Sequence, residues 1–162
     1  VFIGGVAVSV FLIGLLSQIR PRHYIFRWYA TRALSKLKKL GDDRPKQYYL
    51  LRSINPFVIE EMVLTSLKRA GHKIVRNKRY TGDGGIDGQV YIKGKHYLIQ
   101  TKRYRKHINP AHVQEFAIVC KRRGVSGLFV HTGKTGPMSK ERAKEQGIEI
   151  ISGERLFKML LA

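Results

Sequence analysis

The sequence predicts an α/β fold with three layers and a mixed central sheet, extending from about Asn55 to the C-terminus. Three observations support this fold class. The expected elements follow the order helix, three strands, helix, strand, helix, strand, helix. Asn-Pro pairs, which are typical of helix starts, precede two of the helical segments. A Lys-Gly-Lys turn joins two of the strands as a hairpin.

Local signals define each element in turn. Asn55-Pro56 caps the first helix and Gly71 stops it, while Asn109-Pro110 caps the second helix. The expected elements, in order, are a helix from Asn55 to Gly71, a strand at 72–76, a hairpin at 87–102 that turns at 93–95, a helix at 110–121, a buried strand at 127–131, a short helix capped by Ser139 and ending at Gln146, a strand at 148–151 and a helix at 153–161.

The charge of the chain predicts a polyanionic partner. Its 162 residues contain 31 Lys and Arg but 11 Asp and Glu, a formal net charge of +20. We expect nucleic acid to be the partner after Asn55, and anionic lipid is a candidate before it. The single cysteine, Cys120, excludes a disulfide framework and a Cys-based zinc site. Gly133-Lys134-Thr135 is not an ATPase loop, because Leu128 occupies the position of the required first glycine.

The first 19 residues are apolar and predict a transmembrane helix. Nineteen helical residues span roughly 28 Å, close to the ~30 Å hydrocarbon core of a bilayer. The basic and aromatic stretch that begins at Arg20 is typical of the cytoplasmic flank of such a helix. A buried core helix and a signal peptide are the alternatives, although a signal peptide normally has its basic residues before the apolar core.

Residues 20–54 are expected to form a basic juxtamembrane helix and a linker. Apolar and basic side chains recur at helical spacing from Tyr24 to Leu40, and Gly41 and Pro45 end the pattern. Two interpretations remain open: the helix lies on the anionic headgroups of the inner leaflet, or its apolar side packs on the following domain. The segment 46–54 is expected to be a linker or a short extended piece.

A glycine-rich turn and an apolar strand carry the candidate chemistry. The turn at 82–88 delivers Asp87 to the start of a strand, and the next strand ends in Gln100-Thr101-Lys102. Side chains at i and i+2 of a strand share a face, so Gln100 and Lys102 point the same way, and the hairpin brings Asp87 beside them. An acid, a carbonyl oxygen and an ammonium on one face predict a site for Mg²⁺ and a phosphodiester.

These two motifs also carry a family resemblance. The run Gly82-Asp-Gly-Gly-Ile-Asp87, followed by Gln100-Thr-Lys-Arg-Tyr104, resembles the catalytic core of the Mrr-like restriction endonucleases. They are a branch of the PD-(D/E)xK nuclease superfamily in which Gln often replaces the acid of the (D/E)xK motif. The resemblance covers about 55–162 and implies the three-layer restriction-endonuclease-like fold.

The resemblance implies Mg²⁺-dependent hydrolysis of DNA by a type IV restriction enzyme, with Mn²⁺ as a possible substitute. Asp87 and Gln100 would bind the metal, and Lys102 would orient or deprotonate the attacking water. Glu60 stands where relatives carry a further metal ligand, and Gln114 stands where they carry a Gln that orients the water or the Lys. With the apolar N-terminus, this predicts an enzyme of the bacterial inner membrane, single-pass or more, whose catalytic domain is cytoplasmic.

Two basic runs are candidates for contact with DNA. The loop after the catalytic strand contributes Arg103, Arg105 and Lys106, and the end of the following helix contributes Lys121, Arg122 and Arg123. The second run also suits the helix dipole, so it does not by itself indicate DNA binding. The alternative function is a membrane-tethered module that binds DNA without cleaving it, although binding alone would not require Asp, Gln and Lys together.

Overall fold

The computed structural model describes residues 21–77 and 84–162. The predicted membrane helix at 1–19 lies outside these residues and stays a prediction. Among the helices that the structure describes, none has the length and apolar character needed to cross a bilayer.

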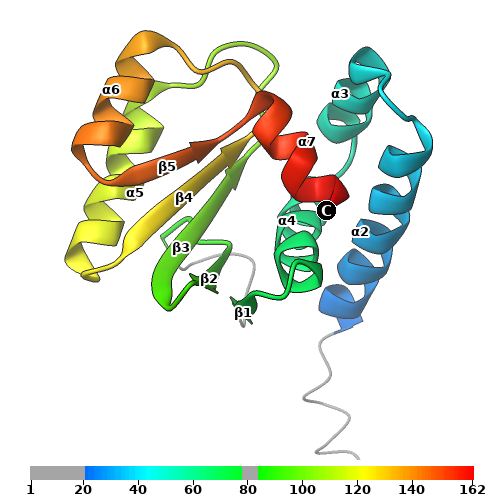
Figure 1. Ribbon diagram of the computed structural model, residues 1–162, viewed down its shortest axis with the longest axis horizontal. Coiled ribbons are helices and arrows are strands. Elements are labelled where there is room, and N and C mark those ends of the chain that lie inside the picture. Colours follow the sequence, from blue (N-terminus) through cyan, green and yellow to red (C-terminus); the bar gives the residue numbers. More distant parts are fainter. Residues whose placement is uncertain (1–20, 78–83) are drawn as a thin grey trace, which may run out of the picture.

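The chain forms a five-stranded sheet with helices on both faces (Figure 1). Helices α5 and α6 cover one face, and α2, α3, α4 and α7 lie on the other side. The elements are α2 (Pro21–Lys39), α3 (Arg44–Ser53), α4 (Pro56–Arg69), β1 (Lys73–Arg76), β2 (Gly88–Ile92), β3 (Lys95–Lys102), α5 (Pro110–Arg122), β4 (Ser126–His131), α6 (Pro137–Glu145), β5 (Ile148–Ile151) and α7 (Gly153–Leu161).

The predicted α/β fold and its order of elements after Asn55 are confirmed. The sheet is mixed, because β1, β2 and β3 pair antiparallel whereas β3, β4 and β5 pair parallel. Asn55 and Asn109 each accept a backbone N–H through the side chain at the start of α4 and α5. Lys93 and Gly94 both have positive φ, at 49° and 78°, as the tight hairpin turn requires.

Alternating strand residues separate two apolar cores. Ile99 of β3 and Val130 of β4 pack with α4 and α7, whereas Leu98 and Phe129 pack with α5 and α6. The two faces of β3 are therefore covered by different helices, so each residue of this strand can be assigned to one side of the sheet.

The N-terminal helices pack on the sheet domain instead of extending away from it. Ala30, Leu34 and Leu37 of α2 and Leu51 of α3 are buried in the same core as α4 and α7. The apolar side of the helix at 24–40 therefore covers the domain, as one of the two interpretations expected, whereas its contact with anionic headgroups stays a prediction. The division of the chain at residue 55 stays a prediction, but the core extends across it.

Two predicted boundaries were wrong. Residues 46–53 lie in helix α3 and Ile54 is its C-cap. Asp43 accepts the backbone N–H of Lys46 as the N-cap, so the segment is not an extended linker. Helix α6 begins at Pro137 after the N-cap Gly136, and Ser139 is buried inside the helix rather than capping it. Pro at the first turn is compatible with a helix start and explains the earlier beginning.

Glu61 connects three elements through a buried carboxylate. Its side chain is 2% exposed and lies 2.8 Å from Arg76 of β1 and 3.9 Å from Arg27 of α2. Because the substitution leaves the part-buried guanidinium of Arg76 without its carboxylate partner, we expect Glu61→Ala to lower the free energy of unfolding by about 1–3 kcal/mol. Urea unfolding, with the exposed Glu141→Ala as control, measures this. A difference within about 0.5 kcal/mol between the two variants would contradict it.

Candidate active site

The residues before β2 are fastened to the second half of β3. The backbone N–H of Asp87 donates to the carbonyl oxygen of Ile99 at 2.8 Å. The carboxylate Oδ2 of Asp87 in turn accepts the backbone N–H of Thr101. This second bond fixes the position of the carboxylate along β3, between Gln100 and Lys102 in the sequence. The predicted proximity of Asp87 to the strand that carries Gln100 and Lys102 is therefore present in the structure.

The side-chain amide of Gln100 is oriented by the glycine-rich turn. Its Nε2 donates to the carbonyl oxygen of Gly85 at 2.7 Å, which assigns the other amide atom as Oε1. Gln100 is 7% exposed, and Oε1 is buried with no hydrogen-bond partner in the part of the chain that the structure describes. A buried carbonyl oxygen without a partner is costly, so this atom is suited to accept a water or to bind a cation.

Gly85 allows this close approach. Its φ is +75°, and a Cβ built there would lie 2.6 Å from Nε2 of Gln100. The turn therefore requires glycine both for its backbone conformation and for the space beside Gln100. The sequence showed the glycine run, but nothing in it indicated which glycine contacts which side chain.

Lys102 lies on the same face of β3 as Gln100, at the end of the strand. It is half-buried, and its ammonium forms no hydrogen bond or ion pair with any residue of the described ranges. Asp87, Gln100 and Lys102 are thus gathered at one end of the hairpin. The side-chain oxygens of Asp87 and Gln100 can bind a cation, and the ammonium of Lys102 beside them can bind an anionic substrate.

Glu60 and Gln114 are not grouped with these residues. Glu60 is on α4, which packs against the face of β3 that carries Ile99 rather than Gln100. No group of three or more His, Cys, Asp or Glu able to hold a metal occurs among residues 21–77 and 84–162. Gln114 is exposed on α5, where its Oε1 accepts a 3.4 Å hydrogen bond from Arg142 of α6. The roles inferred for both from the resemblance stay predictions.

The basic loop after β3 is anchored on both sides. Arg103 donates through Nη1 to the carbonyl oxygens of Arg52 and Ile54, at 3.1 and 2.7 Å, at the end of α3. The carbonyl oxygen of Lys106 accepts the backbone N–H of Lys134 at 3.0 Å. The side chains of Arg105 and Lys106 are exposed, while these hydrogen bonds hold the backbone of the loop in place. Nothing in the sequence signalled the contact between Arg103 and α3.

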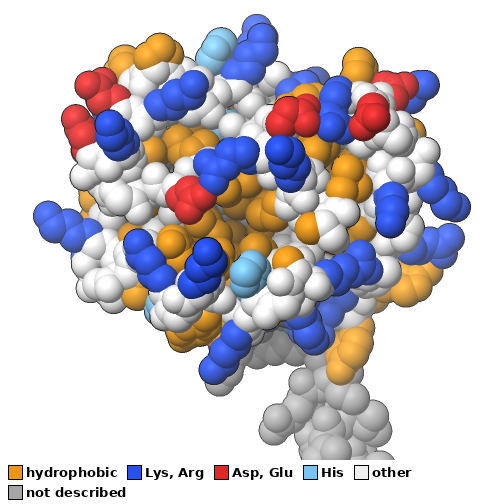
Figure 2. All heavy atoms as spheres, in the orientation of Figure 1, with side chains coloured by type: hydrophobic (Ala, Val, Ile, Leu, Met, Phe, Trp, Pro, Cys, Tyr) orange, Lys and Arg blue, Asp and Glu red, His pale blue; other side chains and the backbone are white. Residues whose placement is uncertain are grey.

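The second basic run lies at the other end of the sheet. Lys121, Arg122 and Arg123 precede β4, whose first residue pairs with Tyr97 near the start of β3. Lys102 pairs with His131 at the opposite end, about 17 Å further along the strand. Lys and Arg side chains are spread over the face seen in Figure 2, with few acidic side chains among them. The structure therefore places the first basic run, but not the second, beside the candidate site.

His131 is a buried, satisfied histidine next to the site. Its Nδ1 accepts the backbone N–H of Gly133 at 3.1 Å, and its Nε2 lies 3.0 Å from Oγ1 of Thr135. A neutral ring with its proton on Nε2 satisfies both contacts. Burial lowers the pKa of His131 from 6.5 to about 4.

The stability of the fold is therefore expected to decrease in mild acid. The unfolded chain protonates His131 near pH 6.5, whereas the folded chain protonates it only near pH 4. The stability that the neutral histidine contributes is therefore complete above pH 6.5 and is lost between pH 6.5 and about pH 4. This interval corresponds to about 3 kcal/mol. Titration of the ring by ¹⁵N NMR checks the cause, since a midpoint near 6.5 in the folded protein would contradict it.

Comparisons with known proteins identify the family. Residues 51–160 match the family model Mrr_cat, described as restriction endonuclease. The chain belongs to this family. Its fold is that of a restriction endonuclease domain, a mixed five-stranded sheet between helices. The Mrr-like resemblance carried by the Gly-Asp-Gly-Gly-Ile-Asp turn and the Gln-Thr-Lys strand is confirmed at the level of the family.

Comparison with solved structures gives two matches at low sequence identity. The crystal structure of a protein of unknown function, AF1548, superposes with a TM-score of 0.53 and 17% identity, over 66% of this chain and 65% of that chain. SfsA of Pyrococcus furiosus in complex with Ca²⁺ gives a TM-score of 0.39 and 18% identity, over 59% and 54% of the two chains. Only the first match, with a TM-score above 0.5, informs the fold. No curated protein matches the chain.

Proposed function

We propose that this restriction endonuclease domain hydrolyses DNA phosphodiester bonds with the help of a divalent metal, Mg²⁺ or in its place Mn²⁺. One observation carries the proposal most: the buried Oε1 of Gln100 lacks a partner among the described residues and lies beside the segment that brings in Asp87. A carboxylate and an amide oxygen are the hard ligands that Mg²⁺ takes in proteins. The donor set therefore fits the metal.

The residues of the chain have distinct parts in the proposed reaction. Asp87 and Gln100 would hold the ion, which when bound neutralises phosphate charge and lowers the pKa of a coordinated water. The N–H of Thr101 and the carbonyl of Gly85 keep these two ligands oriented. Lys102 would position the attacking water and offset the charge that develops on the phosphate.

Cleavage of a supercoiled plasmid by the full chain tests the proposal. We expect nicking in Mg²⁺ or Mn²⁺ and none in EDTA. Lys102→Ala should lower the rate on the order of a hundredfold, because it removes a charge aimed at the transition state. The matched control is Lys95→Ala, an exposed lysine at the other end of the same strand, which should cleave like the parent.

Other results would exclude this function. Cleavage that persists in EDTA, or equal rates for the two lysine variants, would contradict a metal site at this end of β3. Salt-sensitive binding without cleavage of methylated, unmethylated or branched DNA would instead favour the non-cleaving, membrane-tethered module.

Anchoring in the bacterial inner membrane is a separate proposal that rests on the sequence of 1–19 and its basic flank. It predicts that the full chain stays with the membrane pellet after alkaline carbonate extraction. Release into the supernatant would contradict it. The cleavage proposal does not depend on this result.

A further inference from the structure

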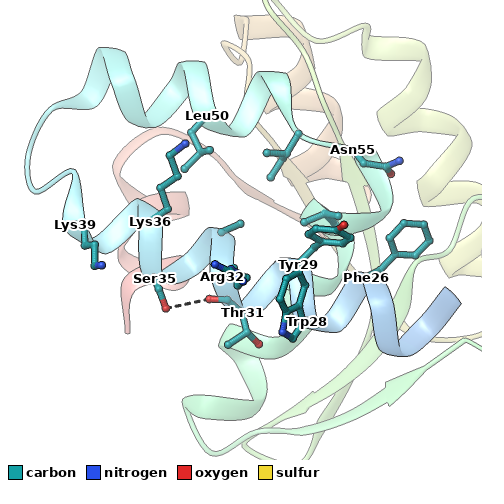
Figure 3. Close-up of a pocket in the computed structure, with 13 residues that line it drawn as sticks. Phe26, Trp28, Tyr29, Thr31, Arg32, Ser35, Lys36, Lys39, Leu50 and Asn55 are labelled. Carbon is teal, nitrogen blue, oxygen red and sulfur yellow. Dashed lines mark hydrogen bonds between the residues drawn. The ribbon is translucent and has the colours of Figure 1, made fainter. Parts of the chain in front are cut away.

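A groove on the outer side of α2 is unaccounted for by the candidate active site. It has a volume of about 860 Å³ and runs between α2, the end of α3 and the start of α4 (Figure 3). Its apolar floor includes Ala33, Leu50 and Val58. Trp28 and Tyr29 line it toward the N-terminal half of α2, and cations line it toward the C-terminal half.

The aromatic side chains in this groove are exposed to an unusual degree. Trp28 is 53% and Tyr29 50% exposed, with their ring centroids 5.0 Å apart. The guanidinium of Arg32 lies 4.5 Å from the ring centroid of Trp28. A cation next to exposed aromatic rings is the arrangement by which proteins bind the phosphate and the base of one nucleotide together.

The cations of the groove are not neutralised. Arg32, Lys36 and Lys39 line it, and none of them forms an ion pair with a residue of the described ranges. Helix α2 contains no Asp or Glu. Three uncompensated charges above an apolar floor favour an occupant that is both anionic and aromatic or apolar.

One end of the groove lies next to a residue that contacts the basic loop after β3. Ile54 and Asn55 line one of its ends. The carbonyl oxygen of Ile54 accepts from Arg103, the residue that directly follows Lys102. The groove and the basic loop are therefore joined through this one contact, although α2 covers the sheet face opposite Gln100 and Lys102.

The geometry points to the groove on α2 as a binding site for single-stranded DNA that flanks the cleaved bond, with bases on Trp28 and Tyr29 and phosphates on Arg32, Lys36 and Lys39. The inference rests on the proposed DNA cleavage for its substrate. The contact between Ile54 and Arg103 favours DNA over a lipid surface, because it joins the groove to the loop that carries the exposed cations Arg105 and Lys106.

The fluorescence of Trp28 reports on the groove directly, since it is the only tryptophan of the chain. The full chain carrying Asp87→Asn, in EDTA, is titrated with a single-stranded oligodeoxynucleotide of about 20 nucleotides, long enough to exceed one binding groove. Stacking of a base on Trp28 should quench its emission. The matched duplex should quench less, because its bases are paired and stacked on one another.

Matched variants locate the binding. Tyr29→Ala should weaken binding roughly tenfold through lost stacking, whereas Tyr49→Ala, which removes a more exposed aromatic on α3 outside the groove, should not. The double variant Lys36→Gln/Lys39→Gln should bind with a weaker salt dependence. The slope of the logarithm of the binding constant against the logarithm of the salt concentration should decrease in magnitude by about 1.4. Lys38→Gln, on the same helix but outside the groove, should change neither the slope nor the quenching.

The outcomes separate this inference from the nuclease proposal. Metal-dependent cleavage without quenching of Trp28 would contradict DNA binding in the groove but not the nuclease proposal. Quenching by single strands without cleavage under any condition would support the groove and remove the proposed nuclease activity. Enhanced, blue-shifted emission with phosphatidylglycerol vesicles and no quenching by DNA would assign the groove to the membrane surface and overturn the inference.

Discussion

Asp87→Asn is expected to lower Mg²⁺-dependent DNA cleavage on the order of a thousandfold while DNA binding persists. The substitution keeps the shape of the side chain and an oxygen that can accept the Thr101 N–H, but it removes the negative charge. Loss of the only carboxylate among the two proposed ligands weakens metal binding, and several kcal/mol of charge stabilisation corresponds to a rate effect of this size.

Single-turnover cleavage together with DNA binding in Ca²⁺ measures both consequences of Asp87→Asn. Asp42→Asn, in the exposed turn between α2 and α3, controls for the loss of one negative charge elsewhere. Cleavage by Asp87→Asn at more than a tenth of the parent rate would show that this carboxylate is not a metal ligand.

Gly85→Ala should have the second largest effect, a loss of cleavage of about 10–100-fold with a folded protein. The added Cβ would lie 2.6 Å from Nε2 of Gln100 and push the amide away from the carbonyl of Gly85 that orients it. Gly84 provides a close control. It has nearly the same φ, +73° against +75°, but a Cβ there meets no atom within 4 Å.

Both alanine variants carry the same backbone strain of about 1–2 kcal/mol, so a comparison of the two isolates the contact with Gln100. Cleavage rates are compared at a temperature where thermal unfolding shows both variants to be folded. Equal losses in Gly84→Ala and Gly85→Ala would mean that strain in the turn, rather than the orientation of Gln100, controls activity.

Local signals explain why most of the fold was predictable from sequence. The Asn-Pro caps of α4 and α5 and the Lys93-Gly94 turn act within a few residues, and each is present in the structure. Helix α3 was missed because its stability comes from tertiary contacts. Gln47, a polar residue without an obvious pattern, is fully buried and donates to the carbonyl oxygen of Gly41 at 2.6 Å.

The candidate site was predictable only in part for a related reason. Strand periodicity places Gln100 and Lys102 on one face, and the hairpin brings Asp87 to them. The contacts that orient these side chains join residues distant in sequence, such as Gln100 with Gly85 and Arg103 with Ile54. No periodic pattern encodes such pairs, so only the structure shows that Oε1 of Gln100 is buried without a hydrogen-bond partner among the described residues.

Metal binding in the presence of DNA that resists cleavage tests the central claim most directly. The full chain is titrated with Mn²⁺ beside a phosphorothioate DNA, and bound Mn²⁺ is measured by electron paramagnetic resonance for the parent, Asp87→Asn and Gln100→Leu. The account predicts that the parent binds Mn²⁺ and that either substitution weakens this binding at least about tenfold. Equal Mn²⁺ binding by all three proteins would contradict a metal site built from Asp87 and Gln100.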